Sequence, residues 1–218
     1  MAGLTTGVKA TFAGNKKLLI GTLSNEGTVT SMVEGRGLVS VDAMENQAES
    51  EAQYADDEVW TMVQGAPLLT GSMTFMQLND DVRVDFFGQQ EVTATMGATT
   101  VTGFADVGSY PQRILQYLIE GTATMADGSV ERAALLTVFP NAQVTSTPSK
   151  ESETNTDGTS VVNWTADIQA TATSKYRFNG KSQAMYEFQI IGDDAVNAMW
   201  AELDKGTFAL PTASTPKS

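Results

Sequence analysis

Hydrophobic and polar residues alternate along much of the chain, and this period of two is typical of half-buried β-strands. The clearest example is Val161–Thr173. One face of this segment carries Val162, Trp164, Ala166, Ile168 and Ala170, and the other face carries Asn163, Thr165, Asp167 and Gln169. The segment Ala184–Ile191 repeats the pattern, with Tyr186, Phe188 and Ile190 on one side. Both segments are therefore predicted to be strands that turn one face to the core.

Short turn sequences separate the alternating segments. They occur at Ser24–Gly27, Ala126–Ser129, Thr156–Gly158 and Phe178–Gly180. Asp-Gly and Asn-Gly pairs supply the positive φ angles of tight hairpin turns. The segments Arg113–Thr124 and Val130–Val144 flank one such turn and are predicted to form a long hairpin, although the apolar spacing after Pro111 also fits the start of a helix. Hairpins spread along the whole chain indicate an antiparallel β protein.

Two segments have helical spacing instead. In the first, Asp193 and Asp194 precede apolar residues spaced i, i+3, i+4 and i+7, and Gly206 follows them; these apolar residues are Val196, Met199, Trp200 and Leu203. In the second, Asn79, Asp80 and Asp81 precede Val82 and the pair Phe86-Phe87, and Gly88 follows. Because a helix N-terminus favours negative charge and side-chain caps, we interpret both acidic groups as capping residues rather than metal ligands.

An acidic segment begins where an apolar strand face ends. Val39, Val41 and Ala43 share the face that further along carries Glu45, Gln47, Glu49, Glu51 and Gln53, and Asp56 and Asp57 lie just beyond. This change of character predicts a strand that leaves the core and projects outward. The acids are interpreted either as a solvated hairpin or as an acidic rim that repels a polyanion.

The ends of the chain and one internal stretch contain few apolar residues. Met1–Thr6, Thr147–Ser160 and Thr212–Ser218 are expected to be exposed and mobile. The organisation predicted from this is a single domain over residues 1–211, with an N-terminal arm, and a flexible tail over 212–218.

Composition removes most kinds of chemistry. The chain has 218 residues with no histidine and no cysteine, which excludes Ser-His-Asp and Cys-His catalysis, disulfides, and zinc sites of imidazole or thiolate. With 13 basic and 26 acidic residues its formal charge is −13, which argues against tight binding to nucleic acid. No apolar stretch is long enough for a membrane anchor. We therefore predict no catalytic, cofactor-binding or metal-binding residues.

Two segments, taken in order, resemble the major tail protein (tail tube protein) family of long-tailed, non-contractile bacteriophages. The first is Glu51–Trp60, with its Tyr-Ala-Asp turn before a strand, followed by the Gly/Ser/Thr-rich run Gly71–Gly88. The second starts at Gly103-Phe104 and continues through a hairpin, a Thr/Ser-rich loop, the strand Val161–Thr173 and the last strand and helix. The likeness covers residues 30–205, and it is carried by order and spacing more than by any single residue.

The resemblance implies a fold and a function. It implies a β-sandwich of two packed antiparallel sheets with one or two short helices, joined into hexameric rings that stack as a tail tube in the virion. The inner sheets of a ring would close into a barrel around an acidic channel through which DNA passes without specific binding. Glu45, Glu49, Glu51, Asp56 and Asp57 are the candidates to line this channel or to meet a neighbouring subunit.

The resemblance also implies partners and a site of synthesis. The partners are further copies of the chain, the tape measure protein, the tail terminator and the distal tail protein, with synthesis in the cytoplasm of the bacterial host. No added immunoglobulin-like module and no cofactor are expected. The alternative functions are a Thr-rich β-sandwich adhesin or surface-binding module and, less well supported, a glycosidase with paired carboxylates.

Overall fold

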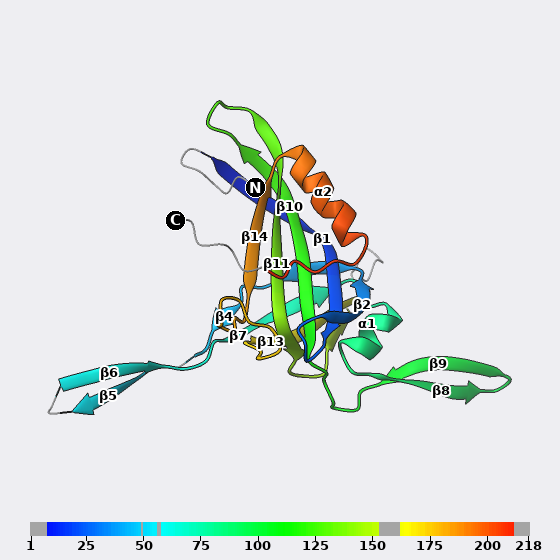
Figure 1. Cartoon of the computed structure of the whole chain (residues 1–218). Coiled ribbons are helices and arrows are strands. Elements are labelled where there is room, and N and C mark those ends of the chain that lie inside the picture. The colour runs from blue at the N-terminus through cyan, green and yellow to red at the C-terminus, as the bar shows by residue number, and fades with distance from the viewer. Residues whose placement is uncertain (1–7, 49, 56–57, 153–161, 212–218) are drawn as a thin grey trace.

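The computed structural model describes residues 8–48, 50–55, 58–152 and 162–211. Strands dominate it (Figure 1). The strands are β1 (Lys9–Leu23), β2 (Val29–Gly35), β3 (Leu38–Val41), β4 (Glu45–Asn46), β5 (Ser50–Ala55), β6 (Glu58–Gln64), β7 (Leu68–Phe75), β8 (Gln90–Met96), β9 (Thr99–Ala105), β10 (Arg113–Thr124), β11 (Val130–Val144), β12 (Ser149–Ser152), β13 (Val162–Thr171) and β14 (Tyr186–Ile191). The helices are α1 (Asp80–Asp85) and α2 (Asp193–Leu203).

The predicted strands lie where the alternation placed them. The hairpin of β10 and β11 has the predicted bounds and turns through Gly128, which has a φ of 86°. The strand interpretation of the segment after Pro111 is therefore confirmed, and the helical alternative is wrong. β13 and β14 fall within their predicted ranges, and β13 buries Ala166, Ile168 and Ala170.

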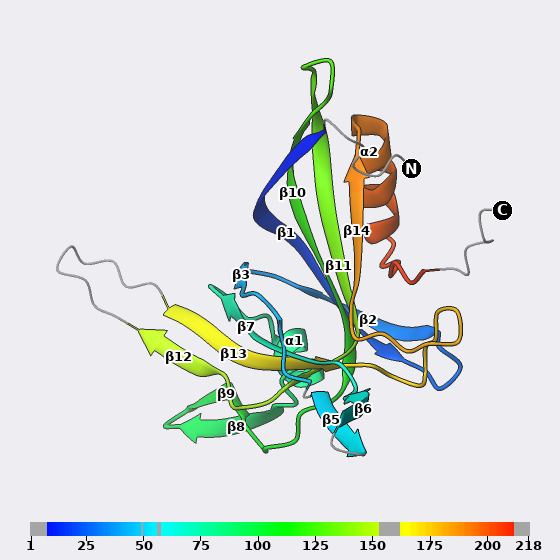
Figure 2. The same ribbon diagram turned by 90° about the vertical axis from the view of Figure 1, so that its left-hand side faces the viewer.

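The strands form two layers. The helix-side sheet contains β2, β1, β10, β11 and β14, and the second sheet contains β12, β13, β7, β3 and β4. They are joined because the end of β11, Ala142–Val144, pairs with Ile168–Ala170 of β13. Figure 2 shows the helix-side sheet standing nearly upright beside α2, while β7, β12 and β13 cross below it. The prediction of a mainly β chain with two antiparallel sheets and short helices is confirmed.

Two apolar clusters hold the layers together. The larger lies between the sheets and includes side chains that are fully buried; among them are Leu18, Ile20, Met73, Phe75, Leu115, Phe139 and Ile168, with Phe86 and Phe87 beside α1. The smaller lies between the other face of the helix-side sheet and α2, and it includes Leu118, Leu136, Ile190, Val196 and Leu203. The order of layers is therefore second sheet, core, helix-side sheet, helix.

Both predicted helices are present, but α1 ends at Asp85, before Phe86 and Phe87, and the predicted side-chain caps are absent. Acidic residues occupy the first turn of each, yet neither N-terminus has a side-chain cap. Gly192, at the N-cap of α2, has no side chain that could accept a hydrogen bond from the helix. Asn79, at the N-cap of α1, makes its side-chain hydrogen bonds with the backbone of Glu34 and Arg36 instead. Among the described residues, neither helix is long and apolar enough to cross a membrane.

The acidic segment is not one continuous strand. The register of β3 shifts between Leu38 and Ser40, and a gap separates β3 from β4. From Val41 to Glu45 this segment advances by four residues while β7 advances by three, so Val41 pairs with Met73 on the core side and Glu45 pairs with Thr70 on the opposite side. The prediction that the apolar and acidic residues share one face is wrong, because alternation cannot be carried across a bulge.

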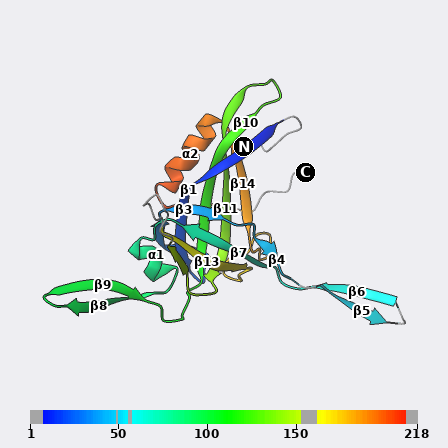
Figure 3. The same ribbon diagram turned by 180° about the vertical axis from the view of Figure 1, so that it is seen from behind.

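The predicted projection of this segment is confirmed. β5 and β6 form a separate two-stranded hairpin that extends away from both sheets (Figures 1 and 3). Of the stretch Thr147–Ser160, residues 149–152 form β12 and pair with β13. Residues 153–161 and both predicted terminal arms lie outside the described residues.

A carboxylate on β10 holds α2 against its sheet. Oε1 of Glu120 accepts hydrogen bonds from Nε1 of Trp200 at 2.6 Å and from Arg132 at 2.8 Å. Burial alone would raise the pKa of Glu120, but the hydrogen bonds from Trp200 and Arg132 outweigh it and lower that pKa. The ionised carboxylate therefore stabilises the fold at neutral pH, and this contribution is lost as pH falls through the lowered pKa.

We expect Glu120→Gln to lower the free energy of unfolding at pH 7 by about 1 kcal/mol, because the site is partly exposed. The difference from the parent protein should shrink at about pH 3, below the ordinary carboxyl pKa. Denaturant unfolding at both pH values measures this. The matched control is Glu187→Gln, a change of the same kind at an exposed residue of β14, which should leave stability within about 0.5 kcal/mol. Equal effects of the two changes at pH 7 would contradict the role of Glu120.

Candidate functional surfaces

The second sheet has one buried face and one polar face. Register places Trp164, Ala166, Ile168 and Ala170 opposite Phe75, Met73, Gly71 and Leu69, and this is the core side. The alternate residues make the polar face, which comprises Asn163, Thr165, Asp167, Gln169 and Thr171 of β13, Thr70, Ser72 and Thr74 of β7, Ser40 of β3, Glu45 of β4 and Asp42 between β3 and β4. These side chains are half-buried or exposed, and no described element covers them.

Acids and neutral polar groups make up this polar face, and no Lys or Arg belongs to it. Asp42 accepts a hydrogen bond from the Ser72 hydroxyl at 2.5 Å, and Asp167 accepts one from Ser146 at 3.2 Å. Both carboxylates nevertheless remain exposed to solvent, as does Glu45. The surface therefore offers negative charge and hydroxyl groups to whatever faces it.

Three arginine side chains stabilise contacts between elements of the fold away from the polar face. Arg83 stacks on Trp164, on the core side, at 4.5 Å from the ring centroid. Arg113 makes a two-pronged ion pair with Asp85, at 3.1 and 3.0 Å, which ties α1 to β10. Arg132 binds Glu120, as described above. These three arginines therefore contact other groups than the polar face.

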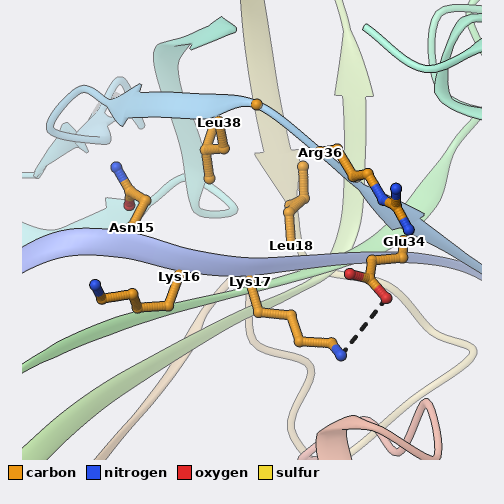
Figure 4. Close-up of a pocket in the computed structure, with 9 residues that line it drawn as sticks. Asn15, Lys16, Lys17, Leu18, Glu34, Arg36 and Leu38 are labelled. Carbon is orange, nitrogen blue, oxygen red and sulfur yellow. Dashed lines mark ion pairs between the residues drawn. The ribbon is translucent and has the colours of Figure 1, made fainter. Parts of the chain in front are cut away.

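A second cluster of cations lies in a cleft of about 330 Å³ where β1 passes the turn between β2 and β3 (Figure 4). Lys17 there pairs with Glu34 at 3.5 Å and with Asp204 at 2.7 Å. Lys16 and Arg36 are exposed beside it. Beside the cleft the register between β1 and β10 shifts on both sides of Asn15, whose side-chain amide donates a hydrogen bond to the backbone oxygen of Val39 in β3 at 2.7 Å. Its cations lie outside the polar face.

In the described part of the chain, neither lateral edge of the second sheet has a partner strand, although on β3 the backbone oxygen of Val39 accepts a hydrogen bond from the Asn15 side chain of β1 at 2.7 Å. Among the described strands, β3 pairs only with β7 and β12 pairs only with β13. Every pairing from β3 through β7 and β13 to β12 is antiparallel, so strand direction alternates across the sheet. An open edge presents unpaired N–H and C=O groups and is a template for pairing with another chain.

The predicted acidic residues do not form one described cluster. Glu45 lies in β4 on the polar face, and Glu51 lies in β5, in the projecting hairpin, where it pairs with Val63. Glu49, Asp56 and Asp57 lie outside the described residues. Among the residues that the structure does describe, no three acids gather closely enough to hold a metal ion.

Sequence reasoning missed two acids of the polar face, Asp42 and Asp167. A signal for Asp167 was present, because it belongs to the polar side of the strongly alternating strand β13. What the sequence does not give is the pairing of β13 with β7, which adds Thr70, Ser72 and Thr74 to the same surface. A second projecting hairpin, β8–β9, was also missed.

Comparison with known proteins points to one family. The profile of the family described as Phage tail tube protein matches residues 1–215. The Tail tube protein of Lactococcus phage F4-1 is 32% identical over 206 residues, which cover 91% of this chain and 66% of that relative. The Tail tube protein of Lactococcus phage p2 is 32% identical over 191 residues, covering 84% of this chain and 62% of the relative. The chain thus spans slightly less than two thirds of the length of these curated relatives.

Proposed function

The chain belongs to the phage tail tube protein family, and on that premise we propose how it assembles and what it does. We propose that copies of the chain join edge to edge through the second sheet into hexameric rings, and that the rings stack into a tube. The polar face of the second sheet would line the channel that conducts DNA. The observation that carries this proposal is the polar, cation-free face of a sheet whose two lateral edges are both open.

The family assignment confirms the resemblance described from the sequence, and with it a structural protein of the virion tail. Tail tube proteins are structural rather than catalytic, so the prediction that the chain is not an enzyme is also confirmed. The ring, the stacking and the channel are the finer points that we propose.

Strand direction supports closure into a ring. Rotation about a ring axis leaves the direction of every strand along that axis unchanged. Because direction alternates from β3 to β12, the β12 of one copy and the β3 of the next run antiparallel when they meet. The contact is heterologous, and such contacts close into rings when the rotation fits. Closure would give both open edges a partner.

A hexamer also gives a channel of useful size. Each copy contributes the strands β3, β7, β13 and β12 to the wall, so that six copies make a barrel of roughly 24 strands. Strands about 4.8 Å apart and tilted by about 40° then give a backbone diameter of about 50 Å. Barrels of about 16 strands already enclose an aqueous channel. The core, the helix-side sheet and α2 would form successive outer layers of the wall.

The chemistry of the polar face suits passage of DNA without binding. Duplex DNA carries one negative charge per about 1.7 Å, and proteins hold it by placing Lys and Arg against phosphates. Asp42, Glu45 and Asp167 carry the same negative charge as the DNA phosphates, and each subunit of a ring would repeat these three carboxylates. Salt screens such repulsion beyond about 8 Å at physiological strength, which limits the effect to DNA close to the wall.

The projecting hairpin β5–β6 suits contact between rings. It stands clear of the body of its own subunit (Figure 3), and Glu51 and Glu58 belong to its two strands. The tape measure protein, the tail terminator and the distal tail protein are the partners we propose at the inside and the two ends of the tube, by analogy with the family.

Replacement of Glu45, Glu49 and Glu51 by Lys tests the acidic surfaces. Exposed charges contribute little to folding, so the free energy of unfolding of the monomer should change by less than about 1 kcal/mol. Tube assembly or DNA passage should be impaired, because the change adds a positive charge at three places per subunit. Assembly seen by electron microscopy and phage infectivity measure this. The matched control replaces Glu187 and Glu131 of the helix-side sheet and Asp127 of the turn between β10 and β11 by Lys, and both variants behaving like the parent would restore the solvated-hairpin interpretation.

Electron microscopy of the purified protein tests the proposed function directly. Rings and hollow tubes are expected, with growth that depends on concentration or on an initiating tail protein. The alternative, an adhesin or surface-binding module, predicts a monomer under all these conditions. Sedimentation of only a 23.2 kDa species over a wide range of concentrations, with an initiator present, would contradict self-assembly.

A further inference from the structure

The hairpin β8–β9 stands apart from the rest of the molecule. It turns through Gly97 and Ala98, and its two strands pair only with each other. Every residue of β8 is exposed, and so are the first four residues of β9. Figures 1 and 3 show it projecting on the side of the molecule opposite β5–β6.

The two faces of this hairpin have different chemistry. Register places Val92, Ala94, Met96 and Val101 on one face, where Ala94 pairs with Val101. Thr93, Thr95, Thr100 and Thr102 share the other face. The apolar side chains are strongly exposed, at 44% for Val92, 69% for Met96 and 39% for Val101. Such alternation is typical of a strand pair that has a buried side, yet in the described part of the chain nothing covers this one.

A hairpin of two strands without a core is marginally stable in water. Burying the side chains of Val92, Met96 and Val101 against another surface would stabilise it, at about 25 cal/mol for each Å² of apolar area. The hairpin would therefore be stabilised by an apolar surface outside it, against which these side chains could pack.

The chain itself has such an apolar surface, in a groove that lies away from the hairpin. A groove of about 700 Å³ lies between β11, β14, α2 and the segment that follows the helix. Its apolar lining includes Leu136, Phe188, Ile190, Ala195, Met199 and Leu210. The residues after Pro211 are Thr-Ala-Ser-Thr-Pro-Lys-Ser, and none of them has a large apolar side chain that would fill this groove. A groove of this size accommodates several side chains of the kind that the hairpin exposes.

We propose that the apolar face of β8–β9 in one copy packs into the groove between α2 and β14 of a neighbouring copy. The inference rests on the proposed self-assembly, and it adds a second contact to the pairing of sheet edges. The occupant is a second copy of this chain because the hairpin and the groove are present in every copy, and each supplies the apolar surface that the other lacks. The contact would lie on the outer side of the proposed tube wall, where α2 is.

Disulfide trapping tests the contact cleanly because the chain contains no cysteine. One population carries Met96→Cys on the hairpin and the other carries Ala198→Cys in the lining of the groove. The two are mixed as monomers, assembled and oxidised. The matched control is Thr95→Cys, one residue away on the threonine face. Met96→Cys should give at least about fivefold more cross-linked dimer with Ala198→Cys than Thr95→Cys does, because neighbouring residues of a strand point to opposite faces.

The outcomes separate this inference from the proposed function. Cross-linking that depends on assembly and on Met96→Cys supports the contact. Tubes that form normally while Met96→Cys and Thr95→Cys react equally, or not at all, overturn the contact and leave self-assembly intact. Failure of the parent protein to assemble under any condition overturns both.

Discussion

Lys150→Pro is expected to raise the protein concentration needed for ring formation at least about tenfold while leaving the subunit folded. Lys150 lies in β12, the strand at one open edge of the second sheet. The backbone N–H of Thr145 donates a hydrogen bond to the backbone oxygen of Asp167 in β13. This oxygen therefore points to the edge of β13 along which β12 lies, and away from β7. Because backbone groups alternate along a strand, Thr165 and Asn163 also point to β12, and their partners Ser149 and Glu151 make the ladder bonds. The N–H of Lys150 then points away from its own sheet.

Proline at this position removes a donor that, in the proposed ring, only a neighbouring subunit would use. Proline is tolerated on edge strands whose N–H faces solvent, so the monomer should unfold at nearly the same denaturant concentration as the parent. In a ring the neighbour's edge would lose one hydrogen bond and meet the proline ring. A cost of about 1.4 kcal/mol or more per contact raises the critical concentration for assembly at least about tenfold. Sedimentation velocity over a concentration series measures this.

The matched control is Lys150→Thr, which removes the same side chain and its contact with the Trp164 ring but keeps the N–H. Its assembly should resemble that of the parent. If Lys150→Pro assembles as readily as Lys150→Thr, the edge of β12 is not a subunit contact. If both fail, the Lys150 side chain matters rather than the backbone.

Gly121→Ala is expected to have the largest effect on folding. Gly121 lies in β10 opposite Phe12 of β1, and a Cβ there would stand 1.9 Å from the backbone oxygen of Thr11 and 2.7 Å from the Cα of Phe12. Backbone atoms cannot move aside as a flexible side chain can, so β1 would have to separate from β10. We expect a loss of about 3 kcal/mol, a large fraction of the about 5–15 kcal/mol that holds a typical domain folded.

Gly103→Ala provides the control for this change. Gly103 is also within a strand, β9, but the nearest atom to an added Cβ is Cγ2 of Val92 at 4.0 Å, an ordinary contact. Gly103→Ala should be neutral or slightly stabilising, because alanine restricts the unfolded chain. Thermal or denaturant unfolding compares the two. Equal stability of the two variants would contradict the close approach of β1 to β10.

Local patterns predicted the elements that have strong local signals. The hairpin of β10 and β11 combines long alternation with Asp127-Gly128, and the bounds of both strands follow from those residues alone. The helix α2 has apolar residues at helical spacing, and Gly206, with a φ of 78°, follows its end. In each case the residues that determine the element lie within it or beside it.

Pairing between strands that lie far apart in the sequence could not be predicted from local patterns. The polar face exists because β7 and β13 pair in register although more than 80 residues separate them, as in the pair Ser72 and Asp167. The extra residue between Val41 and Glu45, relative to β7, reversed the predicted face of Glu45 relative to Val41. Bulges and pairing partners depend on contacts across the core, so a single-strand pattern does not reveal them. The hairpin β8–β9, by contrast, does carry a local signal, which is the alternation of its residues and the turn at Gly97.

Electron cryomicroscopy of the assembled tube, at a resolution that traces individual strands, tests the central claim most directly. We expect that β12 of each subunit lies antiparallel beside β3 of the next, that Asp42, Glu45 and Asp167 face the channel, and that α2 lies on the outside. A channel wall built from the helix-side sheet, or a ring in which β3 and β12 of adjacent subunits do not meet, would contradict it.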